Sequence, residues 1–447
     1  MAHHLPPGPA EADEVFAPVS ILDAASGKVA AEVPLPSGST ELRGVDISPD
    51  GKVAAVTHLL ARFRLPTTQL DRGWMNTNAL TLVDVASQKR INTVLVDNVD
   101  RGAANPWGVT WTADGKTIGV SHAGTHEMSV IDAAALLAKL AKLPAGQATS
   151  TYGASGAGSA DDVPNDLSFL VGIRRRVPAG GQGPRGVAIV GTKLYTANYF
   201  SDSLSVLDLG GKGPATAIPL GPAPAPSAVR KGEALFNDAS ICFQGWQSCA
   251  SCHSSDARVD GLNWDLLNDG IGNPKNTKSM LLAYQTPPAM SLGVRDTASM
   301  ATRAGIRFIL FAVRPEEEAL ALDEYLKSLQ PIPSPHLVNG KLSEAALRGQ
   351  KLFNDASVGC ATCHPSGLYT DLKPHDVGTK GRFDRDASAF DTPTLIETWR
   401  TAPYLHDGSV KTLAELFTTR NKDDKHGKTS TLKKEQIDDL VAFLLSL

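Results

Sequence analysis

The 447-residue chain has only five cysteines and a formal net charge of only −4. It contains no run of about 18 or more apolar residues, so no ordinary membrane-spanning helix is expected. With a pI of about 6.3, the chain has no basic surplus to make nucleic acid or an anionic membrane surface its main partner. The N-terminus has no basic segment followed by an apolar stretch, so it does not resemble a secretory signal.

Several enzyme motifs are also missing. We find no P-loop, no glycine-rich dinucleotide fingerprint and no Ser-His-Asp pattern. The acidic residues Asp50 and Asp114 precede glycines in predicted turns and do not form a catalytic carboxylate pair. The chemistry of this chain must therefore come from other groups.

Four of the five cysteines form two Cys-x-x-Cys-His units. Two thiols three positions apart on a helical turn can reach both vinyl groups of one porphyrin, and the next histidine then supplies the proximal iron ligand. A zinc ribbon also uses two such pairs but does not need the histidines. The sequence therefore predicts two covalently attached haem c groups and an extracytoplasmic, for example periplasmic, location. The predicted attachment residues are Cys249, Cys252, His253, Cys360, Cys363 and His364.

The N-terminal half repeats one strand pattern. Each copy opens with Gly-Val, alternates apolar with polar residues around a short turn, and is followed by a second strand of the "SVID" type. Such repeats indicate antiparallel hairpins in a radial stack of blades, although a small β-sandwich would use the same hairpins. The hairpins are expected at 43–58, 107–122 and 185–199, and the second strands at 80–85, 128–133 and 204–209, with a partial copy at 19–24.

These copies resemble the YVTN-type β-propeller family. Three full copies and one partial copy are too few to close the usual ring, so we expect upstream blades to be missing, together with a signal peptide. Residues 210–227 are rich in glycine and proline, which is typical of a linker, and a domain boundary is placed near 226.

The C-terminal half is helical in pattern and duplicated. RKGEALFNDAS (230–240) matches LRGQKLFNDAS (348–358), and a Cys-x-x-Cys-His unit follows each. Amphipathic helices are predicted at the ends of both copies. The expected fold is multidomain: an all-β, partial propeller at 1–225, followed by a mainly α tandem of cytochrome c-like haem modules at 226–335 (the first module) and 336–447 (the second module).

Residues 226–447 resemble the di-haem cytochrome c peroxidase and MauG family. The resemblance rests on TPTL (392–395), PYLHDG (403–408) and TLAELF (412–417). It implies two haem domains facing one interface. It also implies reaction with hydrogen peroxide or another small oxidant at one haem, with electrons relayed through the other haem from a redox partner protein.

The distal iron ligands depart from this family pattern. Where the family often has a distal Met or Tyr, this chain has Arg420, which is a very poor iron ligand. His426 is the predicted replacement, because neutral imidazole binds haem iron well, and its alternative is a solvated surface histidine. In the first module Ser291 stands where the second has His406. Met290 is a candidate ligand there, with core packing as its alternative.

No histidine occurs between His253 and His336, so the first haem is predicted to keep an open iron site and to be the catalytic one. Three functions remain: a peroxidase-like enzyme, an electron-transfer cytochrome with a partner-binding propeller, and MauG-like oxidation of a protein or organic substrate. Acid–base residues stay unassigned. Lesser candidates are His406 and Asp407, for structure or a haem propionate, and Cys242 as a buried thiol. Electron relay or core packing is expected of Trp246, Trp264 and Trp399. A metal site or strand structure is expected of His58, His122 and His126.

Overall fold

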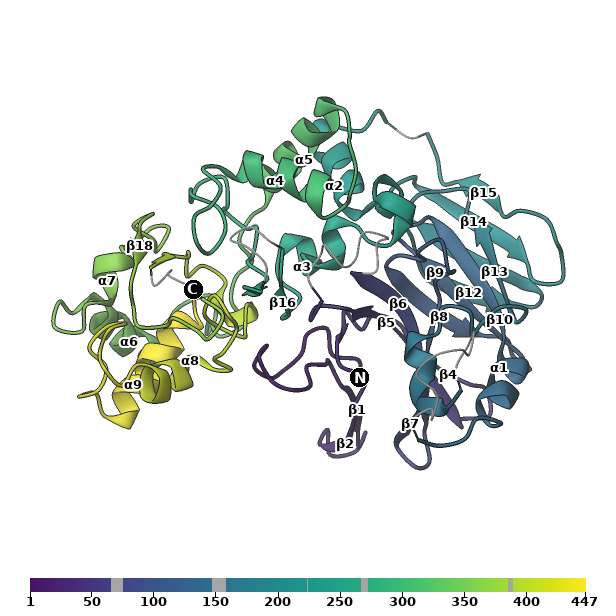
Figure 1. The fold of residues 1–447 in the computed structure, drawn as a ribbon, viewed down its shortest axis with the longest axis horizontal. Helices are drawn as coiled ribbons and strands as arrows, with labels where there is room; N and C mark the ends of the chain where they lie inside the picture. The colour runs from purple at the N-terminus through teal and green to yellow at the C-terminus, as the bar shows by residue number, and fades with distance from the viewer. Residues whose placement is uncertain (66–74, 147–157, 223, 267–271, 385–388) are drawn as a thin grey trace.

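The computed structural model describes residues 1–447 apart from 66–74, 147–157, 223, 267–271 and 385–388. The described residues form a β-rich N-terminal region and a helical C-terminal region. Figure 1 shows the β-rich part on one side, helices α6–α9 on the other, and α2–α5 between and above them. No helix among the described residues is long and apolar enough to cross a membrane.

The N-terminal part, which we call the β region, consists of antiparallel sheets. Its first sheet pairs β1 with β2, and the next has the order β3-β5-β6-β7 with β4 beside β5. Two four-stranded meanders follow, β8 to β11 and β12 to β15. The strands are β1 (Val19–Leu22), β2 (Val29–Val33), β3 (Ser39–Thr40), β4 (Val45–Ile47), β5 (Val53–Ala61), β6 (Asn76–Asp84), β7 (Lys89–Leu95), β8 (Pro106–Trp111), β9 (Thr117–His122), β10 (Glu127–Asp132), β11 (Arg174–Pro178), β12 (Pro184–Val190), β13 (Lys193–Asn198), β14 (Ser203–Asp208) and β15 (Thr216–Pro219), with helices α1 (Ala133–Leu140) and η2 (Ala160–Asn165) between β10 and β11.

The three predicted hairpins are present, as β4–β5, β8–β9 and β12–β13. Their turns contain Gly51, Gly115 and Gly191, whose φ angles of 75°, 70° and 58° favour glycine because a side chain would be strained there. The short tight turns let apolar residues of consecutive strands face the same side, which builds the buried core between sheets.

The glycine of each Gly-Val unit has a packing reason. A Cβ on Gly44 would lie 2.4 Å from the carbonyl oxygen of Trp107, and a Cβ on Gly108 would lie 2.6 Å from that of Arg185. Each glycine therefore lets one sheet approach the next repeat closely. The stacked sheets do not form a closed ring among the described residues, and a complete propeller stays a prediction.

The C-terminal part is built from short helices and long connections. Its elements are α2 (Ala228–Asn237), η3 (Ala239–Ile241), η4 (Phe243–Gly245), η5 (Cys249–Ser251), α3 (Ser254–Ala257), β16 (Asn263–Trp264), β17 (Lys275–Asn276), α4 (Ala298–Phe308), α5 (Glu316–Ser328), α6 (Glu344–Asn354), α7 (Cys360–Cys363), β18 (Pro374–His375), β19 (Phe390–Asp391), η6 (Thr398–Arg400), α8 (Leu413–Glu415), η7 (Leu416–Arg420) and α9 (Lys434–Leu444).

The two copies cross one helix pair in the same way. Helix α2 packs on α5 in the first module, and α6 packs on α9 in the second. A Cβ on Gly232 would lie 1.9 Å from the carbonyl oxygen of Ala321, and a Cβ on Gly349 would lie 1.9 Å from that of Asp439. Only glycine allows these backbones to approach so closely. The exact limits of the modules stay a prediction.

Candidate haem sites

Both Cys-x-x-Cys-His units fold into a single turn that ends at the histidine. The backbone N–H of His253 donates to the carbonyl of Cys249 at 3.0 Å, and that of His364 donates to Cys360 at 3.0 Å. Each histidine then turns its Nδ1 toward the carbonyl oxygen five residues later, Arg258 at 3.2 Å and Tyr369 at 2.7 Å. A metal-bound histidine is commonly held in this way, with Nδ1–H on a carbonyl and Nε2 left for the metal.

The four cysteines of these units are all free thiols, and none is joined in a disulfide. Burial raises the pKa of Cys249 to about 12 and that of Cys360 to about 11. Protonated thiols with no disulfide partner are available for thioether bonds to a porphyrin. The fifth cysteine, Cys242, is buried as expected, and burial raises its pKa to about 11.

A cavity of about 290 Å³ lies on the second unit. Its walls are mainly apolar and come from both modules, which is the usual character of a cofactor pocket. The second module contributes the unit itself and a set of large side chains, and the first contributes polar residues at one edge. Lining residues include Cys360, Cys363, His364, His426, Phe353, Phe390, Tyr404, Leu413, Phe417, Leu444, Thr277, Lys278 and Ser291.

His426 faces His364 across this cavity. The centroids of the two rings are 6.4 Å apart, and their planes differ by 31°. Two imidazole nitrogens that share one metal at about 2 Å each place their ring centroids about 6 Å apart, so the spacing fits one iron between them. The Nδ1 of His426 is buried without a hydrogen-bond partner in the described structure.

The environment keeps His426 neutral. Burial, and secondarily the nearby His364, lower its pKa to about 4. Its loop is fixed by Asn421, whose Oδ1 accepts from the backbone N–H of His426 at 2.8 Å and whose Nδ2 donates to the carbonyl of His426 at 3.0 Å. A neutral imidazole on a fixed loop is ready to bind iron. His426 is half-buried, and its role as an iron ligand stays a prediction.

The first unit lies at the junction of the first module with the β region. Cys249 packs with Phe236, and Cys252 packs with Trp264 and Met75. Met290 is half-buried, and no contact described for this chain links it to His253. The donor set and the orientation of His253 match those of the second unit. The residues present therefore fit covalent haem at both units.

Two buried carboxyl groups stand close to the first unit. Asp260 accepts a hydrogen bond from the indole N–H of Trp264 at 2.7 Å, and Glu41 pairs with Arg43 at 2.6 Å. Both carboxyls are fully buried, and burial raises the pKa of each to about 7. Their charges also raise the pKa of Cys252, after burial. This site thus contains groups that hold protons at neutral pH.

The HDG block lies at the edge of the second cavity. His406 stacks on Phe390, with ring centroids 3.7 Å apart, and its Nε2 lies 2.6 Å from Asp384 Oδ2. Lys275 from the first module lies 2.9 Å from the other oxygen of Asp384. His406 is therefore held by a buried carboxylate between the modules. Arg420 points elsewhere and donates to the carbonyl of Thr379 at 3.0 Å.

The histidines of the β region have separate partners. His58 contacts Leu59 and Thr81, His122 contacts Ser129, and His126 contacts Asp238 and Gly183. His58 and His122 lie within strands β5 and β9, whereas His126 lies in the turn between β9 and β10. Trp246 and Trp264 are buried, and Trp399 is half-buried.

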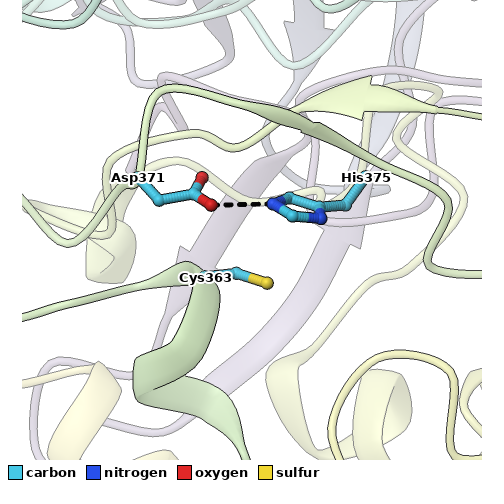
Figure 2. A group of neighbouring side chains, drawn as sticks. All are labelled: Cys363, Asp371 and His375. Atoms are coloured by element: carbon cyan, nitrogen blue, oxygen red, sulfur yellow. Dashed lines mark hydrogen bonds and ion pairs between the residues drawn. The ribbon is translucent and has the colours of Figure 1, made fainter.

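One group with the composition of a metal site occurs among the described residues. The ligand atoms of Cys363, Asp371 and His375 lie within 4.8 Å of one another. Figure 2 shows His375 turned toward Asp371, with a hydrogen bond of 2.8 Å, and Cys363 beside the pair. Because the sulfur of Cys363 is needed for the thioether, we interpret the pair as part of the rim of the second cavity.

Sequence reasoning missed the buried ion pair between the modules. Arg258, just after the first unit, donates to both oxygens of Glu397 at 2.7 and 2.9 Å, and both side chains are buried. It also missed the asparagines of the β region that contact the first unit. Single polar residues in strands or loops form no motif, so only the tertiary contacts reveal them.

Comparison with known proteins finds similar sequences among c-type cytochromes and haem enzymes. The family described as RoxA-like, cytochrome c-like matches residues 389–425. Hydrazine synthase subunit gamma of Kuenenia stuttgartiensis is 35% identical over 274 aligned residues, which cover 49% of this chain and 77% of that protein. The chain belongs to the family of MauG, the cytochrome c peroxidases and hydrazine synthase subunit gamma.

Further members of the family are more distant. Methylamine utilization protein MauG of Methylophilus methylotrophus is 25% identical, over 48% of this chain and 81% of that protein. Cytochrome c peroxidase Ccp of Escherichia coli (strain K12) is 28% identical, over 49% of this chain and 57% of that protein. These relatives support c-type haem binding and an oxidoreductase function for this member of the family.

Proposed function

We propose that the chain is a di-haem c-type oxidoreductase that reduces hydrogen peroxide at the first haem and receives electrons through the second. The overall reaction takes one peroxide, two electrons and two protons to two waters. Bound haem supplies an iron that exchanges electrons and, where its sixth position is open, binds a small oxidant. An extracytoplasmic location, and docking of a partner or shaping of access by the β region, belong to this proposal.

One observation supports the assignment of different roles to the two haem sites. A second imidazole, from His426, faces the proximal His364, whereas no such histidine faces His253 among the described residues. His426 closes the second site to small oxidants and suits it to electron transfer. His253 is held through Nδ1 by the carbonyl of Arg258, and we propose that the iron it would bind keeps an open sixth position.

The residues around the first site also provide protons. Asp260 and Glu41 have a pKa of about 7, so each is partly protonated at neutral pH. Because their pKa lies near neutrality, either carboxyl can take up or release a proton near pH 7. We propose them as the proton reservoir of this reaction.

An electron paramagnetic resonance spectrum of the oxidised, haem-loaded chain tests the proposal. We expect one high-spin haem, whose signal changes on adding peroxide, and one low-spin haem. Two low-spin haems that stay unchanged after half-reduction would reject the peroxidase function and favour an electron-transfer cytochrome. Peroxide consumption that requires an added protein or organic substrate, and that leaves this substrate oxidised, would favour MauG-like chemistry.

A further inference from the structure

The loop that carries the first unit is packed against the β region, whereas the second unit lines its own cavity and exposes part of its turn. Ser251, inside the first unit, is 1% exposed. The corresponding Thr362 of the second unit is exposed. Because the two units share one motif, the difference comes from their surroundings.

Asn105, immediately before strand β8, clamps this loop. Its Nδ2 donates to Ser248 Oγ at 2.9 Å, and its Oδ1 accepts from Ser251 Oγ at 2.7 Å. The backbone N–H of Asn105 donates to Asn78 Oδ1 at 3.0 Å, so strand β6 holds the clamp in place. All of these groups are buried, and an unpaired polar group here is costly.

Asn76, the first residue of β6, contacts the attachment sulfur itself. Its Nδ2 lies 3.4 Å from Cys252 Sγ and 3.1 Å from Gln247 Oε1. The free thiol of Cys252 stands here for the thioether sulfur of the haem-loaded chain, which is a weak hydrogen-bond acceptor. Asn76 is completely buried, so its N–H dipole acts in a low-dielectric setting.

Two more residues of the β region fix the chain on either side of the unit. Asn78 Nδ2 donates to the carbonyl of Trp246 at 3.3 Å, and Thr40 Oγ1 donates to that of Asp260 at 3.0 Å. The second unit has no counterpart of these contacts among the described residues. The first unit is therefore positioned from outside its own module.

We propose that the β region completes the first haem site: Asn105 positions the attachment loop, and Asn76 raises the reduction potential of the first haem through the Cys252 sulfur. A donor aimed at a sulfur of the macrocycle stabilises the extra electron of the reduced state. Two imidazole ligands lower the potential of the second haem relative to methionine ligation. With haem bound at both units, this difference in potential would favour electron transfer from the second haem, which would be oxidised, to the first, which would be reduced. The inference rests on the proposed haem attachment at both units.

The test compares Asn76→Ala, Ser251→Ala and the matched control Thr362→Ala in the full, haem-loaded chain. Mass spectrometry counts the attached haems, and a redox titration followed by electron paramagnetic resonance reports the potential of each haem. We expect Asn76→Ala to lower the potential of the first haem only. Ser251→Ala should make amide hydrogen exchange of residues 248–254 roughly fivefold to tenfold faster, while Thr362→Ala changes neither quantity.

Unchanged potentials in an Asn76→Ala chain that carries both haems would overturn the tuning role. Unchanged exchange in Ser251→Ala would overturn the clamp, and this measurement decides even if Asn76→Ala does not fold. A wild-type chain without haem on Cys249 and Cys252 would overturn the proposed function together with this inference.

Discussion

His426 differs from the surface histidine that its charged sequence neighbourhood suggests. It lies in a lysine-rich loop, yet its half-buried ring lines the second cavity and faces the ring of His364, with centroids 6.4 Å apart. Asn421 orders the loop by binding its backbone from inside. The buried side-chain amide of Asn421 thus orders the polar loop that carries the candidate ligand His426.

Replacing His426 with alanine should remove the sixth ligand of the second haem. We expect the low-spin signal of one haem to be replaced by a high-spin signal, because one strong nitrogen donor is lost. Electron paramagnetic resonance and the haem absorption spectrum measure this change. His375→Ala is the control, since His375 lines the same cavity but bonds Asp371, and it should keep the low-spin signal. A low-spin spectrum retained in His426→Ala would contradict the assignment.

At the scale of elements, the helix crossing of each module depends on a glycine. The α6–α9 pair places Gly349 against Asp439 with no room for a methyl group, and aromatic rings close the crossing, Phe353 against Phe443 at 5.2 Å between centroids. The α2–α5 pair repeats this with Gly232, and with Phe236 against Tyr325 at 5.3 Å. The repeated crossing gives both modules the same frame for their Cys-x-x-Cys-His unit.

We expect Gly349→Ala to lower the free energy of unfolding by about 1–3 kcal/mol, because the new Cβ forces the helices apart. The control is Gly305→Ala in helix α4, where a Cβ would meet nothing within 4 Å. That change should instead stabilise by about 0.5–1 kcal/mol through the better helix propensity of alanine. Denaturant unfolding measures both, and equal effects would refute the packing argument.

At the scale of the whole molecule, one buried ion pair joins the two modules. Arg258 and Glu397 are 2% and 1% exposed, and Glu397 also accepts from the backbone N–H of Ile332 at 2.6 Å, in the segment between the modules. Burial raises the pKa of Glu397, but the hydrogen bonds from Arg258 and Ile332 outweigh it, and the net pKa is lowered. Glu397 is therefore charged at neutral pH, and its pair with Arg258 stabilises the contact between the two modules.

The pH dependence follows from this sign. A glutamate with a lowered folded pKa stabilises the protein fully above its unfolded value of about 4.3, and this stability is lost as the pH falls through the folded pKa. Glu397→Gln should cost about 3–5 kcal/mol at pH 7, because Arg258 stays buried without a counter-charge. The difference from wild type should shrink below about pH 4.

Denaturant unfolding between pH 3 and pH 7 measures this prediction. The apolar double variant Arg258→Met with Glu397→Leu is the matched control, since it removes both charges and should lie much closer to the wild type than Glu397→Gln does. Equal losses in the single and the double variant at pH 7 would show that the unpaired charge of Arg258 is not the cause of the loss.

Local patterns in the sequence predict much of this protein. The predicted haem-attachment residues of each unit lie within one helical turn, so their spacing alone predicts c-type haem. The Gly-Val hairpins and the duplicated α2 and α6 segments follow equally from short-range periodicity and turn residues. The helical C-terminal region and its family resemblance are likewise contained in local motifs.

Contacts between distant segments were decided only by the tertiary structure. His426 meets His364 because packing folds one loop over a cavity, and Arg258 meets Glu397 across 139 residues. Asn76 and Asn105 reach the first unit because the β region packs against the first module. Such residues carry no sequence pattern of their own, since a buried polar group is selected by the partner that the fold brings to it and not by its neighbours along the chain.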